Sequence, residues 1–325
     1  MDLISLGIIL VDMFPVEVGK HLVEVSSFTP KPGGATANVA VAARRMGSQT
    51  AFIGKVGRDL FGNWLRDVLV HEGVDTSGMI FDNEARTSLT FIGMPDEHHA
   101  EFVFYRNPGA DMRLSQEDLN LELLKNTKAL HIDSVSFTSP SYKQATLKAI
   151  EVVRKSGGFI SYDVNYRPTM WDSPEIAISA AKVIIPLSDV IKLNDIELEL
   201  ITGLSDPMAG GEKILEMGGH CCLVTLGEKG SYYITHRHHG FVPAFQVKTI
   251  DSIGCGDAYL GAMLHQLLQF DSLETGLQKE NLEAVLKFSA AAAALTATKR
   301  GALPAIPYRQ EVDDFLNSFN EKEDL

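Results

Sequence analysis

The sequence predicts an open α/β fold, in which a mostly parallel sheet carries helices on both faces and a small β-rich lid is attached. Two observations support this prediction. From residue 115 onward, helical stretches alternate with short apolar strands, as is typical of a parallel sheet with crossover helices. Earlier in the chain, two β-rich segments, at about residues 13–32 and 86–107, interrupt the alternation. We expect residues 1–325 to form a single domain in which these two insertions make the lid.

The first strand is expected at residues 1–12, an apolar run that ends at Asp12. After it the chain alternates approximately, and the prolines and glycines of residues 29–34 interrupt regular structure, so we expect short antiparallel strands and a tight turn. The apolar run carries an acid at Asp2, where a signal peptide would carry basic residues. No stretch approaches the roughly 18 consecutive apolar residues of a membrane-spanning helix.

Two helices and a further strand are expected next. Small and apolar residues at 37–46 predict a helix that ends at Gly47, and residues 49–54 predict the strand after it. The stretch 59–72 has leucine, tryptophan and valine at helical spacing and a glycine directly after it, so it predicts the second helix.

The rest of the chain supplies a hairpin, four strands and two long helices. Residues 87–92 and 101–105 are β-rich runs joined by a polar turn at 95–99, which predicts a hairpin. The short apolar strands are expected at residues 129–132, 159–162, 190–193 and 221–224. The helices are expected at residues 257–269 and 282–298.

Polar residues follow the predicted strands at the point where each strand ends. In open α/β sheets, ligands bind outside the carboxyl ends of the strands. The polar and glycine residues at these ends are Asp12, Asp133, Asp163, Asn165, Asn194, Thr225 and Gly227. We therefore expect the ligand site at this edge of the sheet.

The strongest functional signal is a small-residue turn, Gly254-Cys255-Gly256, that runs into Asp257 and an apolar helix. The first amides of a helix lack intrahelical partners and carry partial positive charge, so such a turn can hold a phosphate. The carboxylate of Asp257 would lie beside that phosphate, where it can accept the proton of an attacking hydroxyl. Because aspartate is a favoured helix cap, a purely capping role is the alternative for this residue.

Two motifs in the same order resemble those of the ribokinase-like sugar kinases, often called the PfkB family. The segment GCGD at residues 254–257 is similar to that family's GAGD, with Cys255 where alanine is usual. The segment GGATANVA at residues 33–40 is similar to its GGAPANVA, with Thr36 in place of the common proline. The resemblance covers nearly the whole chain, and it implies a ribokinase-like fold and ATP-dependent phosphorylation of a sugar.

The resemblance also implies roles for individual residues. The catalytic set is Asp257 with Gly254, Cys255 and Gly256. The residues assigned to the sugar are Asp12, Gly33, Gly34, Asn38, Arg106, Asn165 and Arg167. The residues assigned to the nucleotide are Asn194, Thr225, Gly227 and Gly230. Glu197 is assigned to Mg²⁺ indirectly, and Asp251, Ile253 and Gly301 are assigned to a monovalent cation such as K⁺. Taken singly, Asn38 would suit a helix cap and Glu197 a solvated helix face.

Within the family, the segments around Arg106 and Arg167 look most like those of fructokinases, so fructose is the favoured substrate. The 2-keto-3-deoxygluconate kinases share much of this pattern. The two arginines would suit the carboxylate of that substrate by bidentate pairing, or they would hold the lid by ion pairs. The family often has Asn and Gly around the adenine where this chain has Ala290 and Ala293, so the adenine contacts are expected to differ.

The composition disfavours several partner classes. A formal net charge of -13 opposes binding to nucleic acid or to an anionic membrane, so a sugar and ATP are the expected partners. The 3 cysteines form no CxxC pair and no zinc-ligand spacing, which favours a reducing cytoplasm. The exposed sheet edges of a β-rich lid favour a homodimer through the lid.

Other enzyme classes lack their motifs in this chain. A Walker A kinase needs GxxxxGK followed by Ser or Thr, and a dinucleotide-binding dehydrogenase needs GxGxxG after an early strand, and neither string occurs. A non-catalytic sugar sensor with the same fold is the rival from another class. The presence of Asp257 behind its glycine turn argues against a sensor, because binding alone requires no base.

Overall fold

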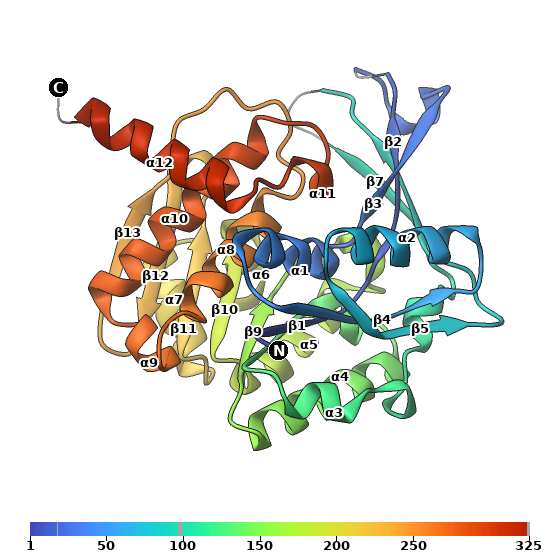
Figure 1. The fold of residues 1–325 in the computed structure, drawn as a ribbon, viewed down its shortest axis with the longest axis horizontal. Helices are drawn as coiled ribbons and strands as arrows, with labels where there is room; N and C mark the ends of the chain where they lie inside the picture. Colours follow the sequence, from blue (N-terminus) through green and yellow to red (C-terminus); the bar gives the residue numbers. More distant parts are fainter. Residues whose placement is uncertain (18, 97–99, 324–325) are drawn as a thin grey trace.

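The chain folds around two β-sheets of unequal size (Figure 1). The computed structural model describes residues 1–17, 19–96 and 100–323. Within these residues the larger sheet has the strand order β13-β12-β11-β10-β9-β8-β1-β4-β5, and the smaller sheet has the order β3-β2-β6-β7. The predicted fold class, an open and mostly parallel sheet with a small β-rich attachment, is therefore confirmed.

The larger sheet is parallel from β5 to β11 and ends in an antiparallel pair. Its parallel strands are β1 (Leu3–Leu6), β4 (Thr50–Gly57), β5 (Asp75–Asp82), β8 (Ala129–Asp133), β9 (Phe159–Asp163), β10 (Val190–Asn194) and β11 (Cys221–Thr225). The antiparallel strands are β12 (Gly230–Thr235) and β13 (His239–Pro243). Each apolar run that predicted a strand from residue 129 onward forms one. β5, β12 and β13 were not predicted from the sequence.

Helices cover both faces of this sheet (Figure 1). On one face lie α1 (Ala35–Met46), α8 (Cys255–Leu267) and α10 (Lys279–Ala297), which pack on one another over Leu3 and Val190. On the other face lie α4 (Pro140–Lys155), α5 (Pro174–Ile184), α6 (Asp195–Thr202) and α7 (Pro207–Glu216). The remaining helices are α2 (Leu60–His71), α3 (Leu121–Lys125), α9 (Leu273–Gly276), α11 (Ala302–Ala305) and α12 (Arg309–Glu323). The helices predicted from residues 37, 59, 257 and 282 onward are all present.

The prediction of a single first strand is wrong, because the chain passes from the larger sheet to the smaller sheet within residues 1–12. β1 ends at Leu6 in the larger sheet, and β2 (Leu10–Pro15) belongs to the smaller sheet. Between them, a Cβ at Gly7 would clash with the side chain of Thr36, so the backbone passes directly against the first turn of α1. Asp12 consequently lies inside β2 instead of following a strand. Apolar periodicity continues through both strands and cannot reveal the change of partner.

The prolines that we expected to interrupt regular structure lie inside a strand. β3 (Phe28–Gly33) contains Pro30 and Pro32, which are the register partners of Met13 and Val11 on β2. β3 is an edge strand, and alternate residues of a strand direct their backbone nitrogens outward. Prolines at these two positions therefore remove no hydrogen bond from the ladder.

The smaller sheet is built from the two predicted insertions. β6 (Leu89–Gly93) and β7 (Glu101–Tyr105) form the predicted hairpin, whose expected turn falls partly on residues 97–99, outside the described residues. β6 pairs in parallel with β2, and this joins the two insertions into one sheet. The sheet projects from the body of the molecule at the upper right of Figure 1. That this sheet acts as a lid, and that the whole chain is one domain, remain predictions.

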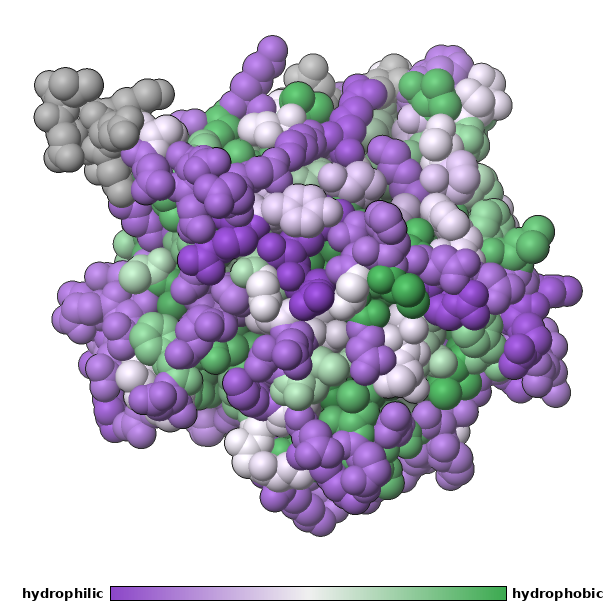
Figure 2. All heavy atoms as spheres, viewed as in Figure 1, coloured by the Kyte–Doolittle hydropathy of each residue, from purple (hydrophilic) through white to green (hydrophobic). Residues whose placement is uncertain are grey.

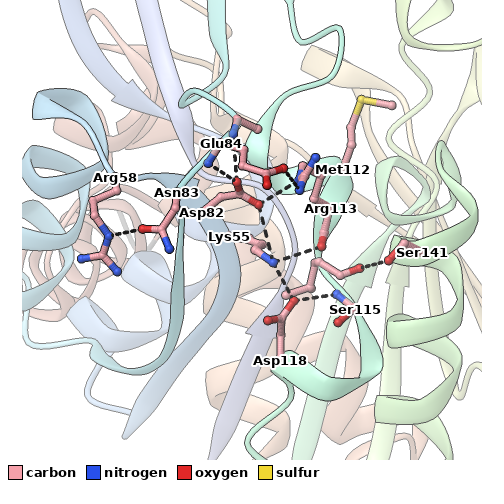
Figure 3. A network of polar contacts seen from close by, with 12 residues as sticks. Lys55, Arg58, Asp82, Asn83, Glu84, Met112, Arg113, Ser115, Asp118 and Ser141 are labelled. Atoms are coloured by element: carbon pink, nitrogen blue, oxygen red, sulfur yellow. Dashed lines mark hydrogen bonds and ion pairs between the residues drawn. The ribbon is translucent and has the colours of Figure 1, made fainter.

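The connections that lead into and out of the smaller sheet are fixed to the larger one by a polar network (Figure 3). Asp82, at the end of β5, accepts hydrogen bonds from the backbone of Glu84 and Ala85, at 2.8 Å each, and from Nε of Arg113 at 3.0 Å. Lys55 of β4 lies 3.7 Å from Asp82. Although burial opposes it, these hydrogen bonds hold the pKa of Asp82 below its usual range. The network fixes the base of the smaller sheet.

We expect Asp82→Ala to lower the free energy of unfolding by about 2–4 kcal/mol, because it leaves two backbone donors and an arginine without their acceptor. Chemical denaturation measures this change. Asp67→Ala is the matched control, since its exposed pair with Arg66 contributes little, and it should leave the midpoint nearly unchanged. Equal effects of the two substitutions would contradict the role of the network.

The surface shown in Figure 2 is predominantly hydrophilic, and its apolar side chains occur in separate small groups. None of the helices within the described residues is both long and apolar enough to cross a membrane.

Candidate active site

Asp257 lies in the first turn of α8, beside a residue that is remote in sequence. The helix begins after Gly254, which has φ +85° and takes the N-cap position, so Asp257 does not serve as the cap. Nδ2 of Asn38, on α1, donates a 2.8 Å hydrogen bond to Oδ2 of Asp257. Asn38 is likewise inside its helix, whose N-cap is Gly34. The capping alternatives for the aspartate and the asparagine are therefore both wrong.

Asp257 and Asp12 are both buried carboxyl groups, and the charge of Asp257 acts on Asp12. Burial and the nearby charge of Asp163 raise the pKa of Asp257 to about 6, against the opposing effect of the Asn38 hydrogen bond. Burial and the charge of Asp257 raise the pKa of Asp12 to about 7. Burial disfavours the ionised form of both carboxyl groups, so the pKa values of both lie near neutral pH. Groups with such pKa values can exchange protons with a substrate at physiological pH.

The two glycines of the GGATANVA segment let the backbone approach the Asp12 side chain at Gly33 and the backbone of Ile8 at Gly34. A Cβ at Gly33 would clash with Oδ2 of Asp12, and a Cβ at Gly34 would clash with the carbonyl oxygen of Ile8. Gly34 also has φ +108°, a conformation that side chains rarely adopt. Oδ1 of Asn38, beside them, is buried and has no hydrogen-bond partner. This corner therefore offers an unpaired acceptor and a carboxylate to a ligand.

A row of charged side chains lies across three neighbouring strands. Asp133, Asp163 and Lys192 are register partners on β8, β9 and β10, so their side chains project from the same face of the sheet. Nζ of Lys192 contacts both oxygens of Asp163, at 3.0 and 3.2 Å. A Cβ at Gly256 would lie 3.1 Å from that Nζ, so the lysine lies directly behind the glycine-rich turn.

Lys192 is a site residue that sequence reasoning missed. Its ammonium group is buried, and despite that burial the charges of Asp163 and Glu197 raise its pKa. It therefore supplies a permanent positive charge next to the turn expected to hold a phosphate. The signal in the sequence was one lysine inside the apolar strand β10.

Asn165 and Asp133 meet at the carboxyl ends of β9 and β8. Nδ2 of Asn165 donates to Oδ2 of Asp133 at 3.1 Å, and the backbone nitrogen of Asn165 donates to Oδ1 of Asp163 at 3.2 Å. Burial raises the pKa of Asp133 to about 7. Of the polar residues predicted to gather at this edge of the sheet, Asp133, Asp163 and Asn165 are therefore brought together.

Asn194 and Glu197 form a reciprocal capping box at the start of α6. Oδ1 of Asn194 accepts from the backbone of Glu197 at 2.8 Å, and Oε2 of Glu197 accepts from the backbone of Asn194 at 2.9 Å. Oε1 of Glu197 accepts from the backbone of Tyr166 at 2.7 Å. Glu197 is buried, so the solvated-face alternative is wrong, and burial raises its pKa. Its carboxylate joins the ends of β9 and β10.

A pocket of about 350 Å³ opens beside the glycine-rich turn. Of the predicted residues, Thr225, Gly227, Gly230, Cys255 and Gly256 line it, together with Ala290 and Ala293. Its other lining includes Tyr259, Phe245 and Val247. Asn194 was assigned to the nucleotide but is not part of this lining. The mixture of apolar walls and helix amides suits an aromatic base joined to phosphates.

The three residues assigned to a monovalent cation also lie together. Oδ1 of Asp251 accepts from the backbone of Ile253 and Oδ2 accepts from the backbone of Gly301, both at 2.9 Å. The carboxylate thus ties the segment before α8 to the segment before α11. No group of three or more His, Cys, Asp or Glu side chains within the described residues has the geometry to hold a metal ion by itself.

The two arginines have different surroundings. Arg106 is buried, and its Nε pairs with Asp111 at 2.5 Å while Nη1 donates to Thr138 at 2.9 Å. Arg167 donates to the carbonyl oxygen of Tyr166, and no ion pair joins it to a carboxylate in the part of the chain that the structure describes. Its charge nevertheless lowers the pKa of both Asp12 and Asp257, so it lies near the catalytic carboxylates.

Residues 1–309 match the pfkB family of carbohydrate kinases. The chain belongs to this family. Fructokinase-2 of Solanum lycopersicum is 42% identical over 313 residues, which are 95% of this chain and 94% of that protein. The crystal structure of fructokinase with bound ATP from Xylella fastidiosa has a TM-score of 0.90 and 30% identity, and covers 98% of this chain and 99% of that one.

A third relative is a double mutant of the fructokinase from Vibrio cholerae O395 in a fructose, ADP and potassium ion bound form. It has a TM-score of 0.87 and 29% identity, and covers 97% of this chain and 98% of that one. Membership of the family confirms the predicted resemblance and makes the chain an ATP-dependent carbohydrate kinase. The sensor alternative is therefore set aside.

Proposed function

We propose that this kinase transfers the γ-phosphoryl group of ATP to a primary hydroxyl of fructose. The observation that carries the proposal is the convergence of Asp257, Asn38 and Asp12 beside the amides of the glycine-rich turn. The similarity to fructokinase-2 of Solanum lycopersicum and to the fructose-bound form of the Vibrio cholerae fructokinase supports fructose as the sugar.

The sugar would bind in the corner formed by Asp12, Gly33, Gly34 and Asn38. Its hydroxyls can donate to the carboxylate of Asp12 and to the unpaired Oδ1 of Asn38. Asp257 then accepts the proton of the attacking hydroxyl as the new O–P bond forms. The free amides at the start of α8, with Lys192 behind them, stabilise the negative charge that develops on the transferred group.

The smaller sheet would close over the bound sugar and exclude water, so that ATP is not hydrolysed.

ATP would occupy the pocket beside Gly256, with its phosphates toward the turn. Mg²⁺ would enter with the nucleotide, held mainly by phosphate oxygens and water, as this ion often is. Glu197 would act on it only indirectly, because both of its oxygens already accept from the backbone. Asp251, Ile253 and Gly301 are our candidates for a K⁺ site.

An acidic sugar is the less favoured substrate. The charge of Arg106 is already neutralised by Asp111, so of the two arginines only Arg167 offers an unpaired charge to a carboxylate. The two arginines are therefore not both available to bind the carboxylate of such a substrate. The Nη2 atom of Arg106 has no hydrogen-bond partner, and we assign it to a sugar hydroxyl.

We further propose a homodimer that forms through the smaller sheet, whose edge strands are β3 and β7. A cytoplasmic location would suit the free thiols of Cys221, Cys222 and Cys255.

We expect the rate of phosphoryl transfer to fall as the pH is lowered through about 6. Asp257 accepts a proton only when it is ionised, and its pKa is raised from an ordinary value of 3.8 to about 6. The loss of activity on acidification should therefore appear near pH 6 instead of below pH 4. Single-turnover rates between pH 5 and 8.5, with both substrates saturating, report this step. A rate that is constant over that range would contradict a base with a raised pKa.

One experiment tests the choice of substrate. ADP formation is measured by a coupled assay with fructose, ribose, 2-keto-3-deoxygluconate and a nucleoside as acceptors. We expect fructose to give the highest kcat/KM. If 2-keto-3-deoxygluconate were the only good acceptor, and Arg167→Ala abolished its use, the assignment to fructose would be wrong.

A further inference from the structure

Asp133 is a buried carboxylate that the mechanism above does not use. Its side chain is 0% exposed, and Oδ1 has no hydrogen-bond partner. The other oxygen accepts one hydrogen bond, from Nδ2 of Asn165. Within the described residues no cation pairs with it, whereas Asp163 pairs with Lys192 and Asp111 pairs with Arg106. Burial of a carboxylate with so few partners costs free energy, so stability does not account for this acid.

The residue that Asp133 contacts has an unusual backbone. Asn165 has φ +40°, and it is the one residue other than glycine with a positive φ in the described part of the chain. Its backbone nitrogen donates to Asp163 and its side chain donates to Asp133, so carboxylates from two neighbouring strands hold it. Strained conformations of this kind persist where the surroundings determine them, and they cluster at functional sites.

A carboxylate next to an amide side chain also decides which end of the amide faces it. Oδ2 of Asp133 accepts from Nδ2 of Asn165, so the NH₂ end of this amide faces Asp133. Oδ1 of Asn165 then faces away, and it accepts no hydrogen bond from any described residue. Asp133 is 0% exposed in this conformation whereas Asn165 is 7% exposed, so Asn165 is the member of the pair that a ligand reaches more readily.

We propose that Asp133 is a positioning residue, which fixes the Asn165 amide so that its oxygen is presented to one hydroxyl of the sugar. The proposal rests on the function proposed above, in which Asn165 contacts the sugar. It makes Asp133 a determinant of sugar recognition that acts through Asn165. The ATP pocket lies beside the glycine-rich turn, and neither residue lines it.

A double-mutant cycle tests this role, with Asp133→Ala, Asn165→Gly and the double variant. Glycine adopts a positive φ without strain, so Asn165→Gly removes the amide and keeps the backbone conformation. We expect Asp133→Ala to raise the KM for the sugar by about tenfold, which corresponds to the loss of one hydrogen bond. The KM for ATP should stay unchanged. In the Asn165→Gly background, Asp133→Ala should cause no further rise in the sugar KM.

Asp133→Asn is the variant of the same shape, and it guards against a folding defect in Asp133→Ala. An amide neighbour can donate as well as accept, so it no longer dictates how Asn165 is turned, and the sugar KM should rise by a smaller factor. That rise should also vanish in the Asn165→Gly background. Equal effects of Asp133 substitutions in both backgrounds would overturn the proposal. So would a lower melting temperature with an unchanged sugar KM, because that result indicates a purely structural role.

The cycle is run with whichever acceptor the unmodified enzyme phosphorylates best in the substrate assay. Failure of fructose in that assay therefore refutes the proposed substrate without affecting the cycle. Additive effects in the cycle refute the role of Asp133 without affecting the substrate.

Discussion

Asp257→Asn is expected to lower kcat by about a thousandfold while the affinity for the sugar stays within about twofold, because a general base typically contributes two to four orders of magnitude. The substitution preserves the shape of the side chain, and the new amide oxygen can still accept the 2.8 Å hydrogen bond from Asn38. What it removes is the ability to take a proton. Steady-state ADP formation measures kcat, and titration calorimetry measures sugar affinity.

Asp12→Asn is the informative comparison for that result. Asp12 faces the same site but is assigned to binding, so its substitution should raise the KM for the sugar more than it lowers kcat. Because Asp12 has a pKa of about 7, it is largely protonated near pH 6 where Asp257 titrates, so Asp12→Asn should leave the acidic side of the pH dependence of kcat nearly unchanged. If Asp257→Asn retained more than about a tenth of the activity, the assignment of the base would be wrong.

Gly254→Ala is expected to have the second largest effect, a fall in kcat of about a hundredfold or more together with a lower melting temperature. The residue has φ +85°, and a Cβ there would lie 2.8 Å from Cα of Ala302. The turn must shift to relieve this contact, and it carries the amides that face the phosphate. A displacement of about 1 Å at a reacting centre can cost about two orders of magnitude in rate.

Gly203→Ala is the matched control for the backbone strain alone. Gly203 has φ +74° at the end of α6, and a Cβ there meets nothing within 4 Å. It should therefore lose about 1 kcal/mol of stability from the left-handed conformation and keep its kcat. Kinetics and thermal unfolding of both variants separate the two effects. A Gly254→Ala enzyme with full kcat would show that the position of the turn is not critical.

The elements that the sequence predicted are those whose signal is local. The helices α1, α2 and α8 are marked by apolar spacing and by glycines at their ends, and the strands from β8 to β11 are short apolar runs between helices. β5 was not predicted because it is an edge strand that begins with the polar residues Asp75, Thr76 and Ser77, so its continuous apolar run is short. The division of the first strand was missed because both halves are apolar.

The candidate site divides in the same way. The sequence by itself determined the glycine-rich turn and Asp257 at the start of α8, since a turn, a helix start and an acid within four residues need no distant partner. Only the tertiary structure decided that Asn38 meets Asp257 across 219 residues and that Lys192 lies behind Gly256. Those contacts depend on strand order and on helices packing over the sheet. A lysine in an apolar strand or an asparagine in a helix has the same local pattern whatever lies opposite it.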